Sequence, residues 1–192
     1  MDTEKKIRTI LEESLKVKKD FLSDRANIAA VAKAALAIIA CCQRGGKVII
    51  FGNGGSAADS QHFAAELIVR FERERESIPA LALTTDTSVL TAFSNDYNFK
   101  DVFKRQIQAL AGPEDIVFAI STSGSSENVL EGVKAAAAKK IQVIGLSGKD
   151  GGELAELSDI AITVRSKNTA RIQEVHITVI HVLCKLIEET LS

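Results

Sequence analysis

Short apolar stretches alternate with longer segments of helical periodicity along most of the chain. The short stretches are rich in β-branched residues and apolar at successive positions, as in strands covered by helices on both faces. This alternation predicts β-α-β units around a parallel sheet, an α/β fold with a doubly wound, three-layer α-β-α sandwich. The five predicted strands are 47–52, 79–84, 115–120, 141–146 and 159–164.

Helices are predicted at both ends of this core. An N-terminal pair covers about 3–21 and 23–44, and Gly45-Gly46 is a usual stop after the second helix. The last segment, 169–191, is apolar over more than one helical face, which favours burial on several sides and therefore an oligomer. No linker or repeat divides the chain, so we expect a single domain over 1–192, with helices in 1–46 and the doubly wound core in 47–192.

Composition narrows the function classes. Lysine plus arginine (24) nearly balance aspartate plus glutamate (25), so charge gives no reason to expect nucleic acid as a partner. The longest apolar run, Ala34–Cys42, is far shorter than the roughly 20 residues that cross a membrane. Cys41, Cys42 and Cys184 lie among apolar residues and form no C-x-x-C pair, as expected of buried thiols in a reducing compartment. We expect a cytoplasmic protein that binds no membrane.

Two loops at predicted strand ends carry groups suited to an anion. The first strand is followed by Gly52-Asn53-Gly54-Gly55-Ser56, and Ser56-x-x-Asp59 resembles a capping box that opens a helix. Glycines at this junction allow backbone N–H groups to approach a ligand at the helix N-terminus. The loop matches neither a G-x-G-x-x-G nor a Walker A motif, so nucleotide binding is poorly supported. An ordinary tight turn remains the alternative.

The third predicted strand ends in a serine-rich loop, 121–126. Five hydroxyls, one glycine and a following helix N-terminus can satisfy phosphate oxygens without a lysine. Serine-rich turns are also common helix caps. Because open α/β sheets usually bind ligands beyond the carboxyl ends of their strands, the two loops are expected to hold one substrate together.

The histidines lie on two predicted helices. His62 and Glu66 are four residues apart and share a helix face, where they form either a surface hydrogen bond or a pair of ligands for a divalent metal. His181 lies on the apolar stripe of the last helix, as a core histidine or as a general acid near neutral pH. Gln173 and His176 lie near the start of that helix, beside Arg171, whose partner is an anion or a carboxylate.

These motifs together resemble the sedoheptulose 7-phosphate isomerases of the SIS (sugar isomerase) family over nearly the whole chain. The matching pieces are the glycine loop, His62-x-x-x-Glu66, Asn95-Asp96, the serine loop, the Arg171–Glu174 stretch and His181. The resemblance implies conversion of sedoheptulose 7-phosphate to D-glycero-D-manno-heptose 7-phosphate, which supplies nucleotide-heptose for lipopolysaccharide core or capsule. It also implies the SIS fold, a homotetramer with active sites at subunit interfaces, and a bound zinc in each subunit.

Site residues follow from the resemblance by position. It makes Glu66 and His181 catalytic, with Glu66 taking a carbon-bound proton and His181 serving the substrate oxygens, as an enediol mechanism requires. The zinc ligands would be His62, Glu66, Gln173 and His181. Contacts with the sugar phosphate would come from Asn53, Gly54, Gly55, Glu66, Asn95, Asp96, Ser121, Thr122, Ser123, Ser126 and Gln173; a simple turn is the alternative for Asn95-Asp96.

One departure and two alternatives remain. Some relatives carry an aspartate where this chain has Ala170, so an acid/base role for that aspartate cannot apply here. A non-enzymatic SIS protein that binds the replication initiator DnaA resembles the chain at Gln61–Ala65 and Leu90–Ala92, but it lacks the residues that match Glu66 and His181. A SIS isomerase of another ketose or amino-sugar phosphate would share both phosphate loops.

Overall fold

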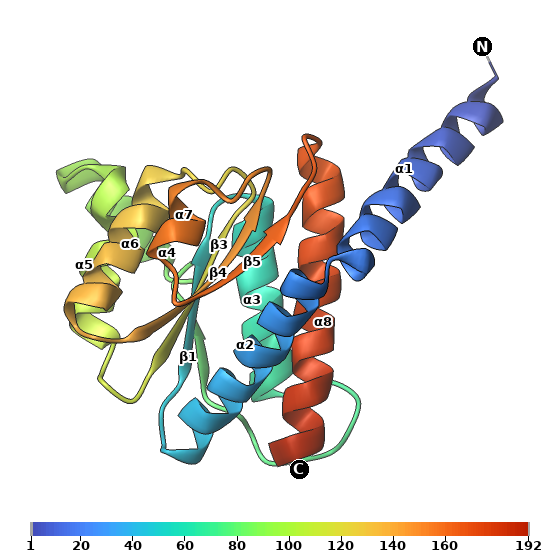
Figure 1. Cartoon of the computed structure of the whole chain (residues 1–192). Helices are drawn as coiled ribbons and strands as arrows, with labels where there is room; N and C mark the ends of the chain where they lie inside the picture. The colour runs from blue at the N-terminus through green and yellow to red at the C-terminus, as the bar shows by residue number, and fades with distance from the viewer. Residues whose placement is uncertain (1, 192) are drawn as a thin grey trace.

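A five-stranded, all-parallel sheet forms the centre of the computed structural model, which describes residues 2–191. Its strands lie in the order β2-β1-β3-β4-β5 (Figure 1). This arrangement confirms the predicted parallel sheet. The edge strand β2, which pairs with β1, contains only three residues where six were predicted. The strands are β1 (Val48–Gly52), β2 (Ala80–Ala82), β3 (Ile116–Ser121), β4 (Gln142–Gly148) and β5 (Ile160–Val164).

The strand order places the two candidate loops side by side. From β1 the chain adds β2 on one side of the sheet, and it then adds β3, β4 and β5 on the other. The switch in direction falls between β1 and β3, whose ends are in register at Gly52 and Ile120. Ligands of open α/β sheets bind at this kind of switch point, beyond the carboxyl ends of the strands. The glycine loop and the serine loop both begin there.

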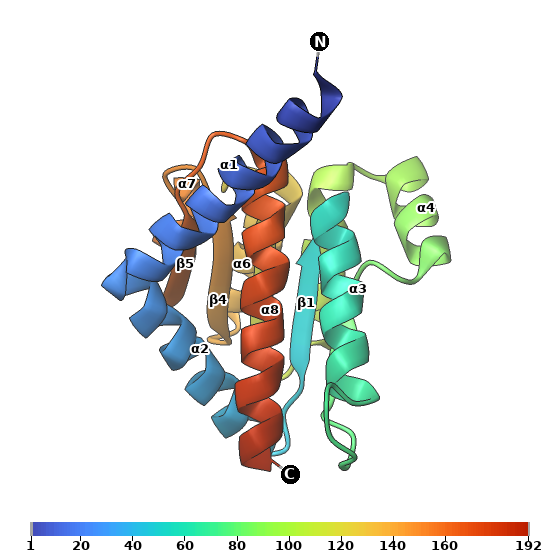
Figure 2. The ribbon, with the colours of Figure 1, turned by 90° about the vertical axis from the view of Figure 1, so that its right-hand side faces the viewer.

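Helices cover both faces of the sheet, as the near-continuous apolar strands predicted (Figures 1 and 2). One core cluster joins the sheet to α2, α3 and α8, and a second joins its other face to α5, α6 and α7. Their bounds are α2 (Arg25–Gln43), α3 (Gly55–Ile68), α5 (Val102–Leu110), α6 (Glu127–Ala138), α7 (Gly152–Leu157) and α8 (Thr169–Leu191).

Helix α2 is the one described helix that is long and apolar enough, by length and composition, to cross a membrane. It lies instead against the sheet, with Val31, Ala34 and Ile38 in the core. Its Asn27 side chain donates to the Thr163 carbonyl and accepts from the Thr163 N–H, both at 2.9 Å, and so ties α2 to β5. These contacts identify α2 as a core helix.

Two helices lie apart from the layers. Helix α1 (Thr3–Ser23) projects away from the body in Figures 1 and 2, and α4 (Thr87–Asp96) stands beside the end of α3; neither contains a buried residue. A short 3-10 turn, Phe99–Asp101, follows α4. The second helix begins at Arg25, two residues later than predicted, because the Asp24 carboxylate accepts from the N–H groups of Ala26 and Asn27 and caps it.

Candidate active site

The glycine loop turns sharply from β1 into α3. Gly54 is the residue before α3, with a φ of +54° that favours glycine, and no side chain caps the helix there. The predicted capping box is therefore wrong: Ser56 is buried inside the first turn, and its carbonyl accepts from Ser60. The first N–H groups of α3 are left without a side-chain partner, an arrangement that favours an anion.

Asn53 joins the glycine loop to α6 across the switch point. Its amide and that of buried Asn128 form a reciprocal pair, each nitrogen 2.8 Å from the other oxygen. The sequence analysis did not identify Asn128, although an asparagine one residue after the start of a helix that follows a serine loop was a usable signal. This pair fixes the distance between the two loops.

The serine loop leads from β3 into α6 with its hydroxyls facing one another. Ser121 Oγ lies 3.0 Å from Ser126 Oγ and 3.3 Å from Ser123 Oγ, which also accepts from the Ser125 N–H. Ser126 precedes α6 and makes no side-chain capping bond. The hydroxyls and the open first turn of α6 therefore present neutral donors to a negatively charged group.

Gly124 packs the serine loop against the loop after β4. Its φ is +67°, and a Cβ atom at this position would lie 2.0 Å from the Gly151 carbonyl oxygen. The Gly124 carbonyl accepts from the Leu154 N–H of α7 at 2.9 Å. Only glycine fits this approach of two backbones, so the conformation of the loop is set by its own backbone packing.

His62, Glu66 and His181 come together from α3 and α8. His62 Nε2 lies 3.1 Å from His181 Nε2 and 3.1 Å from Glu66 Oε1. The Glu66 side chain is 22% exposed and that of His62 45%, so this group is partly open to solvent. The structure thus joins residues 119 positions apart in sequence, which the spacing of either helix alone could not show.

Gln173 lies at the other end of this face, beside the glycine loop. A Cβ atom on Gly55 would be 2.4 Å from Gln173 Nε2, so the amide covers the first residue of α3. His181 is eight residues further along α8, about 12 Å in helical rise. Gln173 is therefore placed against the phosphate-binding loop and reaches the histidines only if its side chain turns along the helix.

The donor atoms around His62 are of the kind that zinc prefers. Two imidazole nitrogens and a carboxylate oxygen converge there, and structural or catalytic zinc sites commonly use this set. Within the described chain, however, no three His, Cys, Asp or Glu side chains are already arranged as a metal-binding group. The residue types therefore fit a zinc ion, while their present arrangement requires side-chain movement to close around one.

Asp59 is a further polar residue on the same side of α3. One carboxylate oxygen is buried without a hydrogen-bond partner. Burial raises the pKa of Asp59 to about 6, against a smaller opposing effect of nearby His62. The sequence interpretation placed Asp59 in a capping box and so missed its proximity to His62, three residues on.

The buried histidine of α8 is His176, whereas the sequence analysis considered His181 either as a core histidine or as a general acid. His176 is fully buried, and its Nε2 lies 3.0 Å from the Ser147 carbonyl oxygen. Burial lowers the pKa of His176 to about 4, despite that hydrogen bond. His181 is only partly buried, with its ring centroid 5.6 Å from that of Phe71. The stripe on α8 is wide enough to hold both.

Other predicted positions lie outside this group. Asn95 and Asp96 are exposed at the end of α4, where the Asn95 amide donates to Asp96 at 2.8 Å. Arg171 takes the carboxylate alternative: its Nη1 lies 3.1 Å from Glu174 and donates to the Ile10 carbonyl of α1. Of the predicted cysteines, Cys41 and Cys184 are buried and Cys42 is half-buried.

The fold and both loops define a sugar-phosphate-binding class of α/β protein, and comparison with known proteins agrees. The family model described as SIS domain matches residues 12–148. Curated relatives include the phosphoheptose isomerase of Roseiflexus sp. (strain RS-1), 50% identical over 94% of this chain and 91% of the relative, and that of Thermodesulfovibrio yellowstonii, 47% identical over 100% and 94%. The chain belongs to the phosphoheptose isomerase family of SIS-domain proteins.

Solved structures of phosphoheptose isomerases have the same fold as this chain. Phosphoheptose isomerase GmhA from Neisseria gonorrhoeae superposes with a TM-score of 0.91 at 41% identity, covering 97% of this chain and 98% of that one. A phosphoheptose isomerase from Francisella tularensis gives 0.93 at 40% identity, covering 98% and 100%. Both match the whole layered fold, including the helices before β1.

Proposed function

We propose that this protein is an aldose–ketose isomerase that converts sedoheptulose 7-phosphate to D-glycero-D-manno-heptose 7-phosphate for nucleotide-heptose biosynthesis. The observation that carries the proposal is that Glu66 and His181 both contact His62, on the two helices whose N-terminal ends bring the glycine loop and Gln173 together. The family membership supports the same reaction. The DnaA-binding alternative is disfavoured, because this chain retains a carboxylate and an imidazole at the positions that acid/base chemistry needs.

The phosphate is held by backbone and hydroxyl donors. In this proposal the phosphate lies between the serine loop and the first turns of α3 and α6, whose N–H and O–H groups it would accept from, and the Asn53–Asn128 pair keeps the loops at a fixed separation. Ser121, Thr122, Ser123 and Ser126 contact the phosphate oxygens in this proposal, with Gly54 and Gly55 on the facing loop. Binding the group farthest from the reacting carbons positions the sugar for reaction at C1 and C2.

The chemistry requires one proton to move between neighbouring carbons. Glu66 takes the proton from C1 or C2, which leaves an enediol, and returns it to the other carbon. His181 moves the accompanying proton between the two oxygens. The Glu66 carboxylate and the His181 imidazole both contact His62 Nε2, so one substrate end can reach both. Zinc, held by His62, Glu66, His181 and a reoriented Gln173, would supply Lewis-acid polarisation of the substrate oxygens.

A homotetramer, with active sites at subunit interfaces, completes the proposal. Helix α1 exposes Ile7, Ile10, Leu11, Leu15 and Leu22, and an apolar groove between α1, α2 and α8 is lined by residues that include Phe21, Ile28 and Val179. Apolar surface of this extent is normally covered by a partner. A second copy would also bring Asn95 and Asp96 to a substrate. We expect the assembled protein in the cytoplasm.

Incubation of metal-quantified protein with sedoheptulose 7-phosphate tests the function, with NMR detection of the aldose phosphate. Conversion by the wild type is expected, with a zinc ion bound in each subunit. Fructose 6-phosphate and arabinose 5-phosphate in parallel reactions distinguish another sugar specificity. Absence of turnover of any sugar, with zinc added and the tetramer intact, would contradict the proposal and favour a binding role, which capture of purified DnaA then tests directly.

A further inference from the structure

A buried ion pair ties the segment after α3 to the far end of α8. The Glu188 carboxylate and the Arg75 guanidinium lie 3.4 Å apart, and their side chains are 1% and 2% exposed. Burying two charges has a large desolvation cost, which is offset only where further hydrogen bonds satisfy both groups. The Glu188 carboxylate and the two terminal nitrogens of Arg75 have such bonds, whereas Arg75 Nε has only the ion pair. The bonds lead to the surroundings of Glu66 and His181.

Glu188 holds the turn that follows α3. Its carboxylate accepts three consecutive backbone N–H groups, from Phe71 at 3.0 Å, Glu72 at 2.9 Å and Arg73 at 3.0 Å. Burial favours the neutral acid, but these donors and Arg75 outweigh it and keep the pKa of Glu188 below its usual range. The charged carboxylate therefore fixes the backbone of this turn.

Arg75 holds the end of α3. One guanidinium nitrogen donates to the Glu66 carbonyl at 2.7 Å, and the other donates to the Leu67 carbonyl at 2.8 Å. These carbonyls belong to the last turn of α3, which ends at Ile68 and lacks helical partners for them. A cation is stabilising at a helix C-terminus. Arg75 thereby fixes the main chain of the proposed base, Glu66, at the C-terminal end of α3.

The same network reaches His181 through Phe71. Glu188 fixes the Phe71 backbone, and the Phe71 ring packs against the His181 imidazole with centroids 5.6 Å apart. His181 and Glu188 are also on one face of α8, about two turns apart. The ion pair thus contacts the surroundings of both proposed catalytic residues, one on each helix, without approaching the phosphate loops.

We propose that the Glu188–Arg75 pair is a positioning device that sets the placement of Glu66 relative to His181. This inference rests on the proposed function for its meaning in catalysis. Both residues are almost fully buried at the end of α3 opposite the glycine loop, so we expect neither to touch the substrate. Loss of the pair should therefore reduce the rate of proton transfer while leaving binding of the phosphate nearly unchanged.

Glu188→Gln tests the proposal, with Glu189→Gln as a matched control on the exposed neighbour, which forms ion pairs with surface Lys185 and Arg73. Displacements of about 1 Å can reduce turnover by about 100-fold. We expect kcat for Glu188→Gln to fall about 10- to 100-fold with KM within about twofold, and no change for Glu189→Gln. Arg75→Lys keeps the charge but not the two-pronged donor geometry, and should fall between wild type and Glu188→Gln.

A second readout is independent of turnover. The protein contains only three histidines, so selective ¹³C-histidine labelling gives few signals, and the Phe71 ring current shifts those of His181. We expect that shift to change in Glu188→Gln and Arg75→Lys and to be retained in Glu189→Gln. If the wild type is inactive, the proposed function fails, while this readout still tests the positioning.

Three results would overturn the inference. They are an unchanged His181 signal in folded Glu188→Gln, a loss of kcat no greater than in Glu189→Gln, and failure of both Glu188→Gln and Arg75→Lys to fold. The last result would show that the pair serves stability alone.

Discussion

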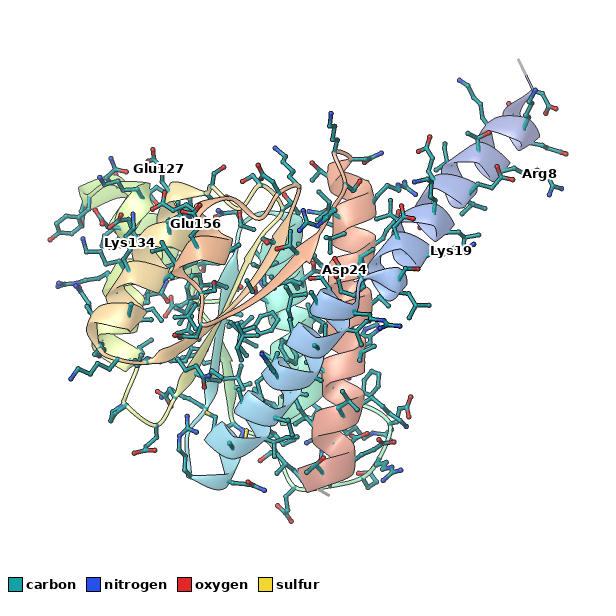
Figure 3. The ribbon with its side chains drawn as sticks, in the orientation of Figure 1. Arg8, Lys19, Asp24, Glu127, Lys134 and Glu156 are labelled. Atoms are coloured by element: carbon teal, nitrogen blue, oxygen red, sulfur yellow. The ribbon has the colours of Figure 1, made fainter. Side chains whose placement is uncertain are left out.

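Helices α3 and α8 differ from α1 and α4 in how much of their surface a single chain covers. The first two bury one side against the sheet and bring His62, Glu66 and His181 within contact. Neither α1 nor α4 buries a residue, and Figure 3 shows Arg8 and Lys19 projecting from α1 into open space. The candidate acid/base group is thus built by one chain, whereas α1 and α4 would be covered only in the proposed tetramer.

This difference separates two requirements of catalysis. Groups that exchange a proton must keep a fixed distance, and the core packing of α3 on α8 provides it. Enclosure of the substrate needs only a wall, and a partner subunit can supply one. In the proposed function, Asn95 and Asp96, exposed on α4, belong to this second kind. A change to the first region should abolish the reaction, and a change to the second should act through assembly.

The largest effect is expected from Glu66→Gln, which changes the acid/base group that α3 and α8 build within one chain. Removing a general base typically costs 10²- to 10⁴-fold in rate, so kcat should fall about 10³-fold, because the amide cannot accept a carbon-bound proton. Binding of the sugar phosphate, measured by calorimetry, should persist. The control is Glu156→Gln on exposed α7, over the opposite face of the sheet (Figure 3). Substantial activity in Glu66→Gln would contradict the assignment of the base.

Leu15→Glu places a charge on the apolar face of α1, which a single chain leaves exposed. Leu15 is 66% exposed on α1, and truncating a buried interface residue can cost about 2 kcal/mol of association free energy, or about 30-fold in affinity. A buried carboxylate should cost at least as much. Light scattering after gel filtration should show smaller species, and activity should fall with them although Glu66 and His181 are intact.

Lys19→Glu on the same helix is the control for the charge change, because Lys19 projects away from the body (Figure 3). It should leave the assembly unchanged. A monomeric Leu15→Glu protein with full activity would show that the site is complete within one chain, and the comparison drawn above would be wrong.

Gly124→Ala sharpens the comparison within the single chain. The new Cβ atom would overlap the Gly151 carbonyl oxygen. The alanine must also keep a positive φ, which costs about 1–3 kcal/mol of strain. We expect KM to rise about tenfold through distortion of the serine loop, with a smaller change in kcat. Gly45→Ala has a comparable positive φ but open space around it, so it should lose stability without a change in KM. If Gly124→Ala and Gly45→Ala had equal KM values, the serine loop would not be part of the substrate-binding site.

Most of the fold could be predicted from the sequence because parallel sheets leave a clear pattern. The apolar runs at β1, β3 and β4 are buried on both faces, and β5, at the edge of the sheet, alternates between buried and half-buried residues; all four patterns are typical of strands. Errors occurred where a local pattern had two meanings. Ser56-x-x-Asp59 matches a capping box, but the φ of Gly54 starts the helix earlier and turns Ser56 inward. The edge strand β2 is shorter than its apolar run because only three residues pair with β1.

The site was less predictable because its residues meet through tertiary packing. Periodicity places His176 and His181 on apolar parts of α8, but it cannot tell which one faces the sheet. The resemblance identified His62, Glu66 and His181, and the structure brings these together. It could not show the Asn53–Asn128 pair or the Arg75–Glu188 pair, because each joins a loop to a helix that is distant in sequence.

The buried face of α8 gives the smallest effect at neutral pH. His176 is neutral in the fold, with a pKa lowered by burial to about 4 from an unfolded value of 6.5. Below pH 6.5 the unfolded chain therefore binds more protons than the folded one, so the free energy of unfolding falls as the pH is lowered from 6.5 to 4. The total loss of unfolding free energy across this range is about 3 kcal/mol, and above pH 6.5 His176 adds no pH dependence.

In His176→Gln the amide can still donate to the Ser147 carbonyl but does not titrate. Urea unfolding between pH 7 and 4 should therefore show a weaker pH dependence than in the wild type. Equal slopes would mean that the imidazole is accessible to protons in the folded protein, and that α8 is less firmly packed against the sheet than its burial indicates.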